Sequence, residues 1–380
     1  MKLTCTRENL YRGLAITSHI STRNVNLPIL NNVLLRVDEG GLKLISTNLE
    51  IAITCHVRGK VEQQGEYTVP SKLLFDYVNL LPNEQVDIDL IDNALSVKCK
   101  RTKTKINGIS ATEFPLVPPV NGSIKYSVSV NEFKNALSST LFATATNESR
   151  PELSGVYLSF HHEGAGKNKM VVAATDSYRL AETVVNISGG SDEAKEVIVP
   201  QRTLAELSRI LSIFRDDVEA SPSVEIELSD NQIVFSYGSV ELTSRTIEGA
   251  YPDYRQIIPT NVKTTAVFDR TSFAQAVKTA SLFSKTGLFD ITVSINPKEG
   301  ALELFSSDSA RGENNASIAG EISGIENTIT LNSRYLLDGI NALSSEKVIL
   351  KVIDGANPCI LMPENMPGES YQYIIMPIRQ

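Results

Sequence analysis

The chain contains one stretch of thirteen residues three times, and this repeat constrains its fold more than any other feature. The copies cover residues 69–81, 199–211 and 331–343. Three features recur in every copy: a basic fourth position, an acidic eighth position, and leucine at positions six and thirteen (Lys72, Arg202, Arg334; Asp76, Glu206, Asp338). The copies begin 130 and 132 residues apart, which is a domain length and not the period of a solenoid. The sequence therefore predicts one domain built three times.

The residues around each copy follow a common order. Each third opens with a short strand and a helix whose apolar residues lie four apart on one face (Leu10 and Leu14, Phe133 and Leu137, Phe273 and Val277). Asn131 and Thr271 are expected to cap first helices. Alternating strands follow, and then the repeated stretch forms a second helix, with caps expected from Ser71 and Ser333. Each third is predicted to hold two helices and about eight short strands. The polar strand faces favour antiparallel sheets, so the fold class is α+β with the helices on one side.

Clusters of proline mark the boundaries between the thirds. They lie at residues 114–119 and 251–259, and no low-complexity linker separates them. We expect three similar domains in tandem, at residues 1–119, 120–249 and 250–380.

The charge is acidic in bulk but unevenly distributed. The net charge of -8 and the pI of about 5.3 argue, taken alone, against a nucleic-acid-binding protein. The expected helices nevertheless carry a basic subset, including Lys72, Arg202 and Arg209, while acidic residues dominate elsewhere. Two interpretations stay open at this point: one basic side of the molecule, or ordinary exposed pairs such as Lys72 with Asp76 at helical spacing.

Residues for catalysis are scarce. The chain has four histidines and no Gly-x-Ser-x-Gly motif, so a catalytic triad is not expected. Its four cysteines are scattered and are expected as buried thiols (Cys5, Cys55, Cys99, Cys359). We predict no enzyme activity, no metal site and no cofactor. The start lacks an apolar signal core and no apolar run approaches the ~20 residues of a membrane span, so we expect a cytoplasmic protein that does not enter membranes.

Several motifs, in the right order within the right repeat, carry a family resemblance over the whole length. They are Leu27-Pro28-Ile29-Leu30, Ala174-Thr175-Asp176-Ser177-Tyr178-Arg179-Leu180, Tyr251-Pro252-Asp253-Tyr254-Arg255 and Met376-Pro377-Ile378-Arg379-Gln380. With the three-fold repeat, they resemble the family of bacterial DNA polymerase III beta subunits, the replicative sliding clamps.

The resemblance implies a non-catalytic homodimeric ring, closed by a head-to-tail contact. Helices would line a central hole and antiparallel sheets would form the outside. Double-stranded DNA would thread the hole without base readout, since any base preference would stop the ring from sliding. The ring would tether the polymerase for processive DNA replication. A peptide-binding scaffold on the same fold, without DNA, is the alternative.

Site residues follow from matching positions in the family. DNA contacts are expected at Arg23, Asn24, Lys72, Asn147, Arg150 and Arg202, and subunit contacts at Thr104, Ile106, Leu282 and Phe283. A groove would bind a short peptide with a Gln and apolar anchors, carried by the DNA polymerase III alpha subunit, the clamp loader and repair polymerases. Its matching residues are Leu153, Thr175, Ser177, Tyr178, Arg179, Leu180, Pro252, Gln256, Ile257, Tyr335, Ala356, Pro358, Ile374, Met376, Pro377, Ile378 and Arg379. Tyr178, Gln256 and Gln380 depart from the commonest family pattern (His, Arg and Leu), which leaves the peptide preference open.

Overall fold

The fold consists of two compact units, described here from a computed structural model. The structure describes residues 1–20, 27–115, 124–146, 149–161, 167–190, 193–213, 221–364 and 371–379. The first unit holds residues 1–130 and 209–246, and the second holds residues 131–208 and 247–380. The division therefore runs through the middle third of the chain, whose two sheets belong to different units.

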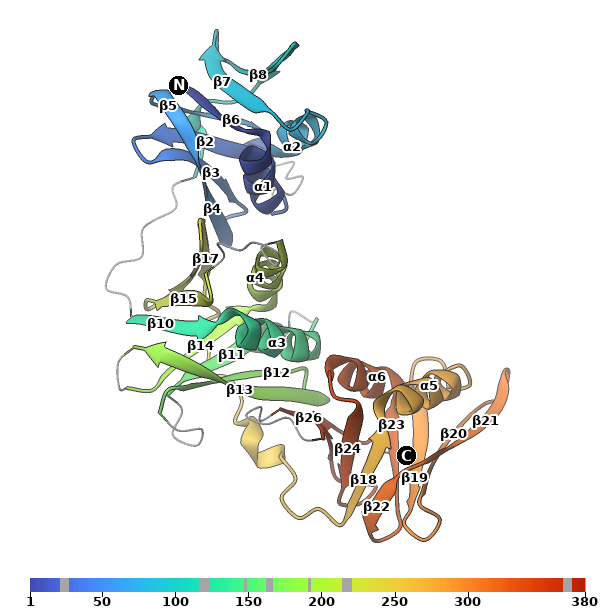
Figure 1. The fold of residues 1–380 in the computed structure, drawn as a ribbon. Helices are drawn as coiled ribbons and strands as arrows, with labels where there is room; N and C mark the ends of the chain where they lie inside the picture. Colours follow the sequence, from blue (N-terminus) through green and yellow to red (C-terminus); the bar gives the residue numbers. More distant parts are fainter. Residues whose placement is uncertain are drawn as a thin grey trace. The chain divides into compact units, whose positions relative to one another are not determined.

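The order of elements repeats three times along the chain (Figure 1). The first third contains β1 (Lys2–Thr6), α1 (Arg7–Thr17), η1 (Pro28–Asn31), β2 (Asn32–Asp38), β3 (Gly41–Thr47), β4 (Ile51–Val57), β5 (Gly59–Gln63), β6 (Gly65–Pro70), α2 (Ser71–Asn79), β7 (Gln85–Ile91), β8 (Ala94–Cys99), β9 (Thr102–Asn107) and η2 (Ala111–Glu113). The second contains β10 (Ile124–Ser129), α3 (Val130–Thr140), η3 (Leu141–Ala143), η4 (Pro151–Ser154), β11 (Gly155–Phe160), β12 (Lys169–Thr175), β13 (Arg179–Gly189), β14 (Lys195–Pro200), α4 (Gln201–Ile213), β15 (Ser223–Leu228), β16 (Gln232–Tyr237) and β17 (Val240–Arg245).

The last third repeats the same order. It contains η5 (Tyr254–Ile257), β18 (Thr264–Asp269), α5 (Arg270–Ser281), β19 (Asp290–Asn296), β20 (Ala301–Asp308), β21 (Gly312–Ala319), β22 (Glu321–Gly324), β23 (Asn327–Asn332), α6 (Ser333–Ala342), β24 (Lys347–Val352), β25 (Cys359–Pro363) and β26 (Gln372–Ile375). Within the described residues each third has two α-helices and eight or nine strands, which confirms the expected content.

The first unit is built on two antiparallel sheets. One has the strand order β5-β1-β7-β8-β9. In the other, β6, β2, β3 and β4 of the first third continue into β17, β16, β15 and β10 of the second. The joining pair is β4 with β17, where Ile53 lies opposite Leu242. A sheet edge left open by one third is thus paired with a strand of the next, which satisfies its backbone groups.

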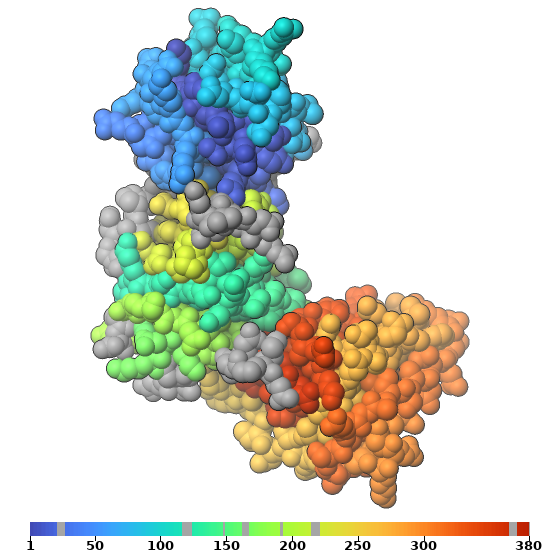
Figure 2. Space-filling model, in the orientation of Figure 1, coloured from blue at the N-terminus to red at the C-terminus, as the bar shows by residue number. Residues whose placement is uncertain are grey.

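The second unit repeats this arrangement. The strands β14, β11, β12 and β13 of the second third continue into β26, β25, β24, β18 and β22 of the last third. The joining pair is β13 with β26, where Leu180 lies opposite Ile374. The remaining sheet has the order β21-β20-β19-β23, and its β20–β21 hairpin reaches the margin of the unit (Figures 1 and 2).

The helices pack their apolar faces against these sheets as expected. Leucines six and thirteen of every repeated stretch are buried (Leu74, Leu81, Leu204, Leu211, Leu336, Leu343), and so are the apolar pairs of the first helices (Leu10, Leu14, Phe133, Leu137, Phe273, Val277). The side chain at position four is exposed in all three copies. The repeat therefore alternates between residues that pack on the sheets and residues that face solvent.

The expected helix caps are wrong in detail. Asn332, and not Ser333, accepts hydrogen bonds at the start of α6, from the N–H groups of Arg334 and Tyr335 at 2.9 and 3.3 Å. The Asp269 carboxylate, and not Thr271, caps α5 through the Ser272 N–H at 2.7 Å. Ser71 and Ser333 are instead buried, because the chain enters each second helix directly from a strand.

One close approach inside α6 allows a test of this packing. A Cβ atom at Gly339 would lie 2.3 Å from Cδ1 of Tyr373, whose ring is completely buried. We predict that Gly339→Ala lowers the free energy of unfolding by about 1–3 kcal/mol, because overpacking exceeds the gain in helix propensity. Urea unfolding measures the change. The control Asn341→Ala, at an exposed position of the same helix, should be within about 0.5 kcal/mol of the parent protein, and an equal loss in both variants would contradict the packing argument.

Candidate functional site

A tight turn between β12 and β13 forms the centre of the candidate groove. The Asp176 carboxylate accepts the N–H groups of Tyr178 and Arg179 at 2.9 and 3.0 Å. The Thr175 hydroxyl donates to the Arg179 carbonyl at 2.7 Å and accepts the Ser177 N–H at 3.1 Å. Ser177 adopts a positive φ of 78°. These bonds fix the turn and leave the Tyr178 side chain 64% exposed.

The end of the chain is anchored beside this turn. β26 pairs with β13, with Ile375 opposite Arg179. Beyond the strand, the Met376 N–H donates to the Tyr178 carbonyl at 2.9 Å, and the Ile378 N–H donates to the Thr330 carbonyl at 2.8 Å. Met376 and Ile378 are therefore half-buried and the segment is held in place, as the apolar character of Met376-Pro377-Ile378 indicates.

Arg179 connects the two parts of the second unit. Its guanidinium donates to Asp176 at 2.9 Å, to Asp338 of α6 at 2.5 Å and to the Phe142 carbonyl at 2.8 Å. It also lies over the Tyr335 ring, 4.4 Å from the centroid. Only 11% of the Arg179 side chain is exposed. We call Arg179 and its four partners, Phe142, Asp176, Tyr335 and Asp338, the Arg179 cluster.

Two of the predicted groove residues belong to a buried aromatic and aliphatic cluster of the second unit. Leu180 and Ile374 are fully buried and pack with residues of β11, β12, β25 and η5 (Tyr157, Val171, Ala173, Tyr254, Ile360). The Tyr254 hydroxyl donates to Glu182 at 2.5 Å, and Gln372 donates to the other oxygen of that carboxylate at 2.8 Å. Burial, followed by the negative charge of Glu182, raises the pKa of Tyr254, so this hydroxyl stays neutral and donates. Leu180 and Ile374 are thus core residues of the second unit, with no side-chain surface exposed to a peptide.

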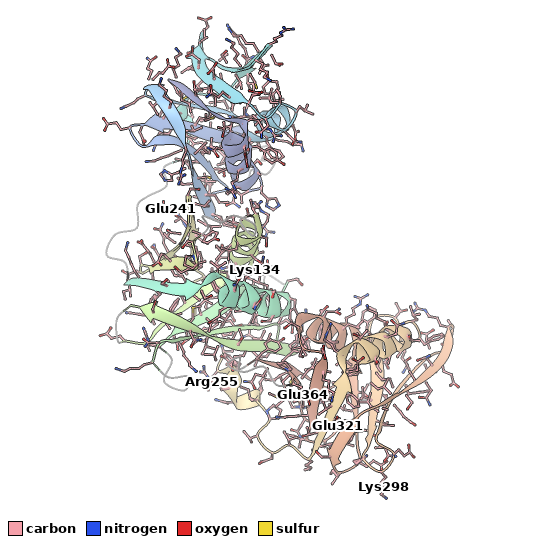
Figure 3. All side chains as sticks on the ribbon, viewed as in Figure 1. Lys134, Glu241, Arg255, Lys298, Glu321 and Glu364 are labelled. Atoms are coloured by element: carbon pink, nitrogen blue, oxygen red, sulfur yellow. The ribbon has the colours of Figure 1, made fainter. Side chains whose placement is uncertain are left out.

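The remaining groove residues lie on segments of the same unit. Gln256 and Ile257 are exposed on η5, where the Gln256 amide donates to Asp253 at 2.8 Å. Pro252 lines a small hollow with Tyr251 and Arg255, and Figure 3 places Arg255 on this segment. Ala356 is exposed and Pro358 half-buried in the loop before β25, while Leu153 is buried on η4. Ser177 and Arg379 are exposed.

The sequence did not reveal the residues that hold Arg179. Asp338 was visible as an acidic position of the repeat, yet its partner lies 159 residues away in the chain. Phe142 contributes only a backbone carbonyl, which leaves no signal in side-chain chemistry.

The residues proposed to face DNA are partly described. Arg23, Asn24 and Asn147 lie outside the described residues. The Lys72 side chain is 89% exposed, with its Nζ 3.9 Å from Asp76, and Arg202 is exposed on α4. Arg150 forms an ion pair with Glu152, with Nε and Oε1 2.9 Å apart. Contact with DNA stays a prediction for each of them.

The four residues proposed for the subunit contact differ in exposure. Leu282, after α5, is 65% exposed and Phe283 is half-buried. Thr104 is half-buried on β9, whereas Ile106 belongs to the core of the first unit at 5% exposure. Within the part of the chain that the structure describes, β9 pairs only with β8 and β21 only with β20.

Across the described ranges, the chain has neither an exposed thiol nor a group of side chains that could hold a metal ion. The four cysteines are free and buried, and burial raises the pKa of Cys359 to about 12. Among the described residues, no three His, Cys, Asp or Glu side chains are grouped so that they could hold a metal ion. None of the described helices has the length and apolar character needed to cross a membrane.

Sequence comparisons cover the entire chain. Models of the N-terminal, central and C-terminal domains of the DNA polymerase III beta subunit match residues 1–118, 127–253 and 255–379. The beta sliding clamp of Synechococcus elongatus is 32% identical over 100% of this chain and 99% of its own length. The beta sliding clamp of Synechocystis is 31% identical with the same coverage.

Solved structures agree with this relationship. The DNA polymerase sliding clamp of Pseudomonas aeruginosa superposes with a TM-score of 0.91 at 27% identity, over 100% of both chains. The sliding clamp of Bartonella birtlesii bound to griselimycin gives a TM-score of 0.90 at 30% identity, again over 100% of both chains.

The Arg179 cluster generates a stability prediction. Arg179→Ala removes a mostly buried cation and leaves Asp338, Asp176 and the Phe142 carbonyl without this donor. We expect a loss of about 3 kcal/mol in the unfolding free energy of the second unit, measured by urea unfolding. The control Arg255→Ala removes an exposed arginine that lies over the Tyr254 ring and should cost less than about 1 kcal/mol. Equal stability of the two variants would show that the cluster does not hold the unit together.

Proposed function

Since the chain belongs to the DNA polymerase III beta subunit family, the beta sliding clamps, we propose that it encircles duplex DNA as a ring and tethers its polymerase. The fold is the three-domain sliding clamp fold, and the protein acts as a non-catalytic processivity factor. The observation that carries the proposal is the basic position of the repeated stretch. Lys72, Arg202 and Arg334 are exposed at equivalent points of α2, α4 and α6, while the chain as a whole carries a net charge of -8.

Such a distribution suits a ring that slides. Long, exposed cations on the second helices would meet phosphates without reading bases, and the acidic remainder would face solvent. Each contact is then sequence-independent and weak, so the ring is held by its topology and not by affinity. We place the helices around the hole, the sheets outside, and the protein in the cytoplasm.

Ring closure would use two copies of the chain. Among the described strands, β9 is an edge strand of the first third and β21 is an edge strand of the last third, and the two differ in sequence. The contact is therefore heterologous, and two such contacts close a homodimer. The three domains of each copy, proposed at residues 1–119, 120–249 and 250–380, would give the ring six similar segments.

The groove around Tyr178 would take the partner peptides. Tyr178 and Ile257 are exposed, the half-buried Met376 is bonded through its backbone to Tyr178, and methionine adapts its shape to different anchors. Gln256 and the backbone of the β12–β13 turn offer polar contacts for a glutamine side chain. We propose segments of the polymerase III alpha subunit, the clamp loader and repair polymerases as occupants.

The ring is tested by its topology on DNA. A clamp loaded by a clamp loader on nicked circular DNA should stay bound through gel filtration, because it can leave only by opening. Linearising the circle should release most of it from the free ends, whereas a protein held by affinity would remain. Retention that does not change on linearisation, or no retention on circles, would favour a scaffold that acts without DNA.

The groove is tested by a labelled peptide that carries a Gln and apolar anchors. Tyr178→Ala should weaken its binding at least about tenfold, because an exposed aromatic anchor is lost, and deletion of residues 376–380 should abolish it. Fluorescence polarisation measures the affinity. Leu49→Ala is a matched control, since Leu49 is also exposed and lies in the corresponding turn of the first third. Unchanged affinity after the deletion would contradict the groove assignment, and the deletion should leave the dimer intact.

A further inference from the structure

The junction inside the second unit shows how two neighbouring thirds are held. In the Arg179 cluster, an arginine that follows a strand-to-strand turn reaches the acidic eighth position of the next third's second helix, Asp338. The same guanidinium donates to the carbonyl of Phe142, which lies twelve residues after the first residue of α3. The ring of Tyr335, at position five of the repeated stretch, covers it.

The last third contains a turn that presents an arginine in the same way as the β12–β13 turn. In the turn between β20 and β21, the Asp308 carboxylate accepts the N–H groups of Ala310 and Arg311 at 3.0 and 3.1 Å, as Asp176 does for Tyr178 and Arg179. The Arg311 guanidinium donates to the Leu282 carbonyl at 3.4 Å and to Thr286 at 2.9 Å. Leu282 lies twelve residues after the first residue of α5, so it corresponds to Phe142. Arg311 corresponds to Arg179 and remains exposed.

The first third contains the acidic side chain that corresponds to Asp338. Asp76 occupies the eighth position of its repeated stretch, as Asp338 does in the last third, and its side chain is 54% exposed. Its ion-pair contact with Lys72 is long, at 3.9 Å, and the lysine is itself almost fully exposed. Leu73, at the position of Tyr335, is 54% exposed, and Leu282, at the position of Phe142, is 65% exposed. Both leucines thus expose apolar surface at positions whose counterparts, Tyr335 and Phe142, contact the arginine inside the second unit.

We propose that Arg311 of one copy forms an ion pair with Asp76 of the partner subunit, and that Leu282 of the first copy packs on Leu73 of the partner subunit. The pair repeats the contact of Arg179 with Asp338 across the boundary between copies. It rests on the proposed function, because it needs the last third of one copy to meet the first third of another. Two identical pairs form in a closed dimer.

The junction inside the first unit shows that this ion pair is not a general property of the repeat. There the Asn48 side chain accepts the N–H groups of Glu50 and Ile51 at 3.1 and 2.8 Å, so Ile51 takes the position of the arginine. The acidic position, Glu206, is buried. Instead Arg209 of α4 donates to the carbonyls of Ala15 and Ile16 at 3.1 and 2.8 Å. Arg311 and Asp76 supply the arginine and the exposed acidic side chain that this junction lacks.

The ion pair predicts a reciprocal effect on dimer affinity. The single variants Arg311→Asp and Asp76→Arg should each raise the dimer dissociation constant about tenfold or more, because like charges then meet at the contact. The double variant R311D/D76R restores opposite charges and should return to within about threefold of the parent protein. Sedimentation over a dilution series measures the constant, and raising the salt concentration should narrow the differences.

Matched controls separate the ion pair from other causes. Lys298→Asp also replaces a positive side chain with a negative one, on the exposed β19–β20 turn that Figure 3 shows at the margin of the last third. It should leave the dimer dissociation constant unchanged. Parent-like dimerisation of both single variants, or no recovery in the double variant, would overturn the ion pair while leaving the ring intact. A parent protein that stays monomeric at micromolar concentration would contradict the ring itself, and the ion pair with it.

Discussion

The hydrogen-bonded pairing of strands from successive thirds is the constraint on which the rest of this structure depends. An isolated third would expose a sheet edge whose N–H and C=O groups need partners. The chain meets this need twice, by pairing β4 with β17 and β13 with β26. Because each pairing fixes where the next third begins, it also fixes which side chains meet at the junction. The contact of Arg179 with Asp338 is one consequence.

The repeat explains why so much of the fold could be predicted from the sequence. Leucines six and thirteen and the apolar pairs of the first helices report local packing, and local packing is what a periodic pattern encodes. The content of helices and strands in each third follows from the same patterns. Continuation of sheets from one third into the next left no such pattern, because strand pairing depends on residues far apart in the chain. Ile53 with Leu242, and Leu180 with Ile374, are examples.

The candidate site was accessible from the sequence only through the family resemblance. Composition and motifs argued against catalysis but did not indicate a groove. Backbone hydrogen bonds connect Met376 to Tyr178 in the β12–β13 turn and Ile378 to Thr330, so they link three distant segments, and much of the geometry comes from backbone groups. The acidic eighth position illustrates the limit of a repeat. Asp76 is exposed, Glu206 is buried and Asp338 binds an arginine, so one residue type at one position has three environments.

The central claim is that two copies close a ring by pairing β9 with β21, as the thirds within one chain pair their strands. Amide hydrogen exchange measured strand by strand tests it most directly. In the dimer, the outward N–H groups of β9 and β21 should be protected to a similar degree as those of β13 and β26, and dilution to the monomer should remove the protection of β9 and β21 alone. Fast exchange of β9 and β21 in a stable dimer would contradict the claim.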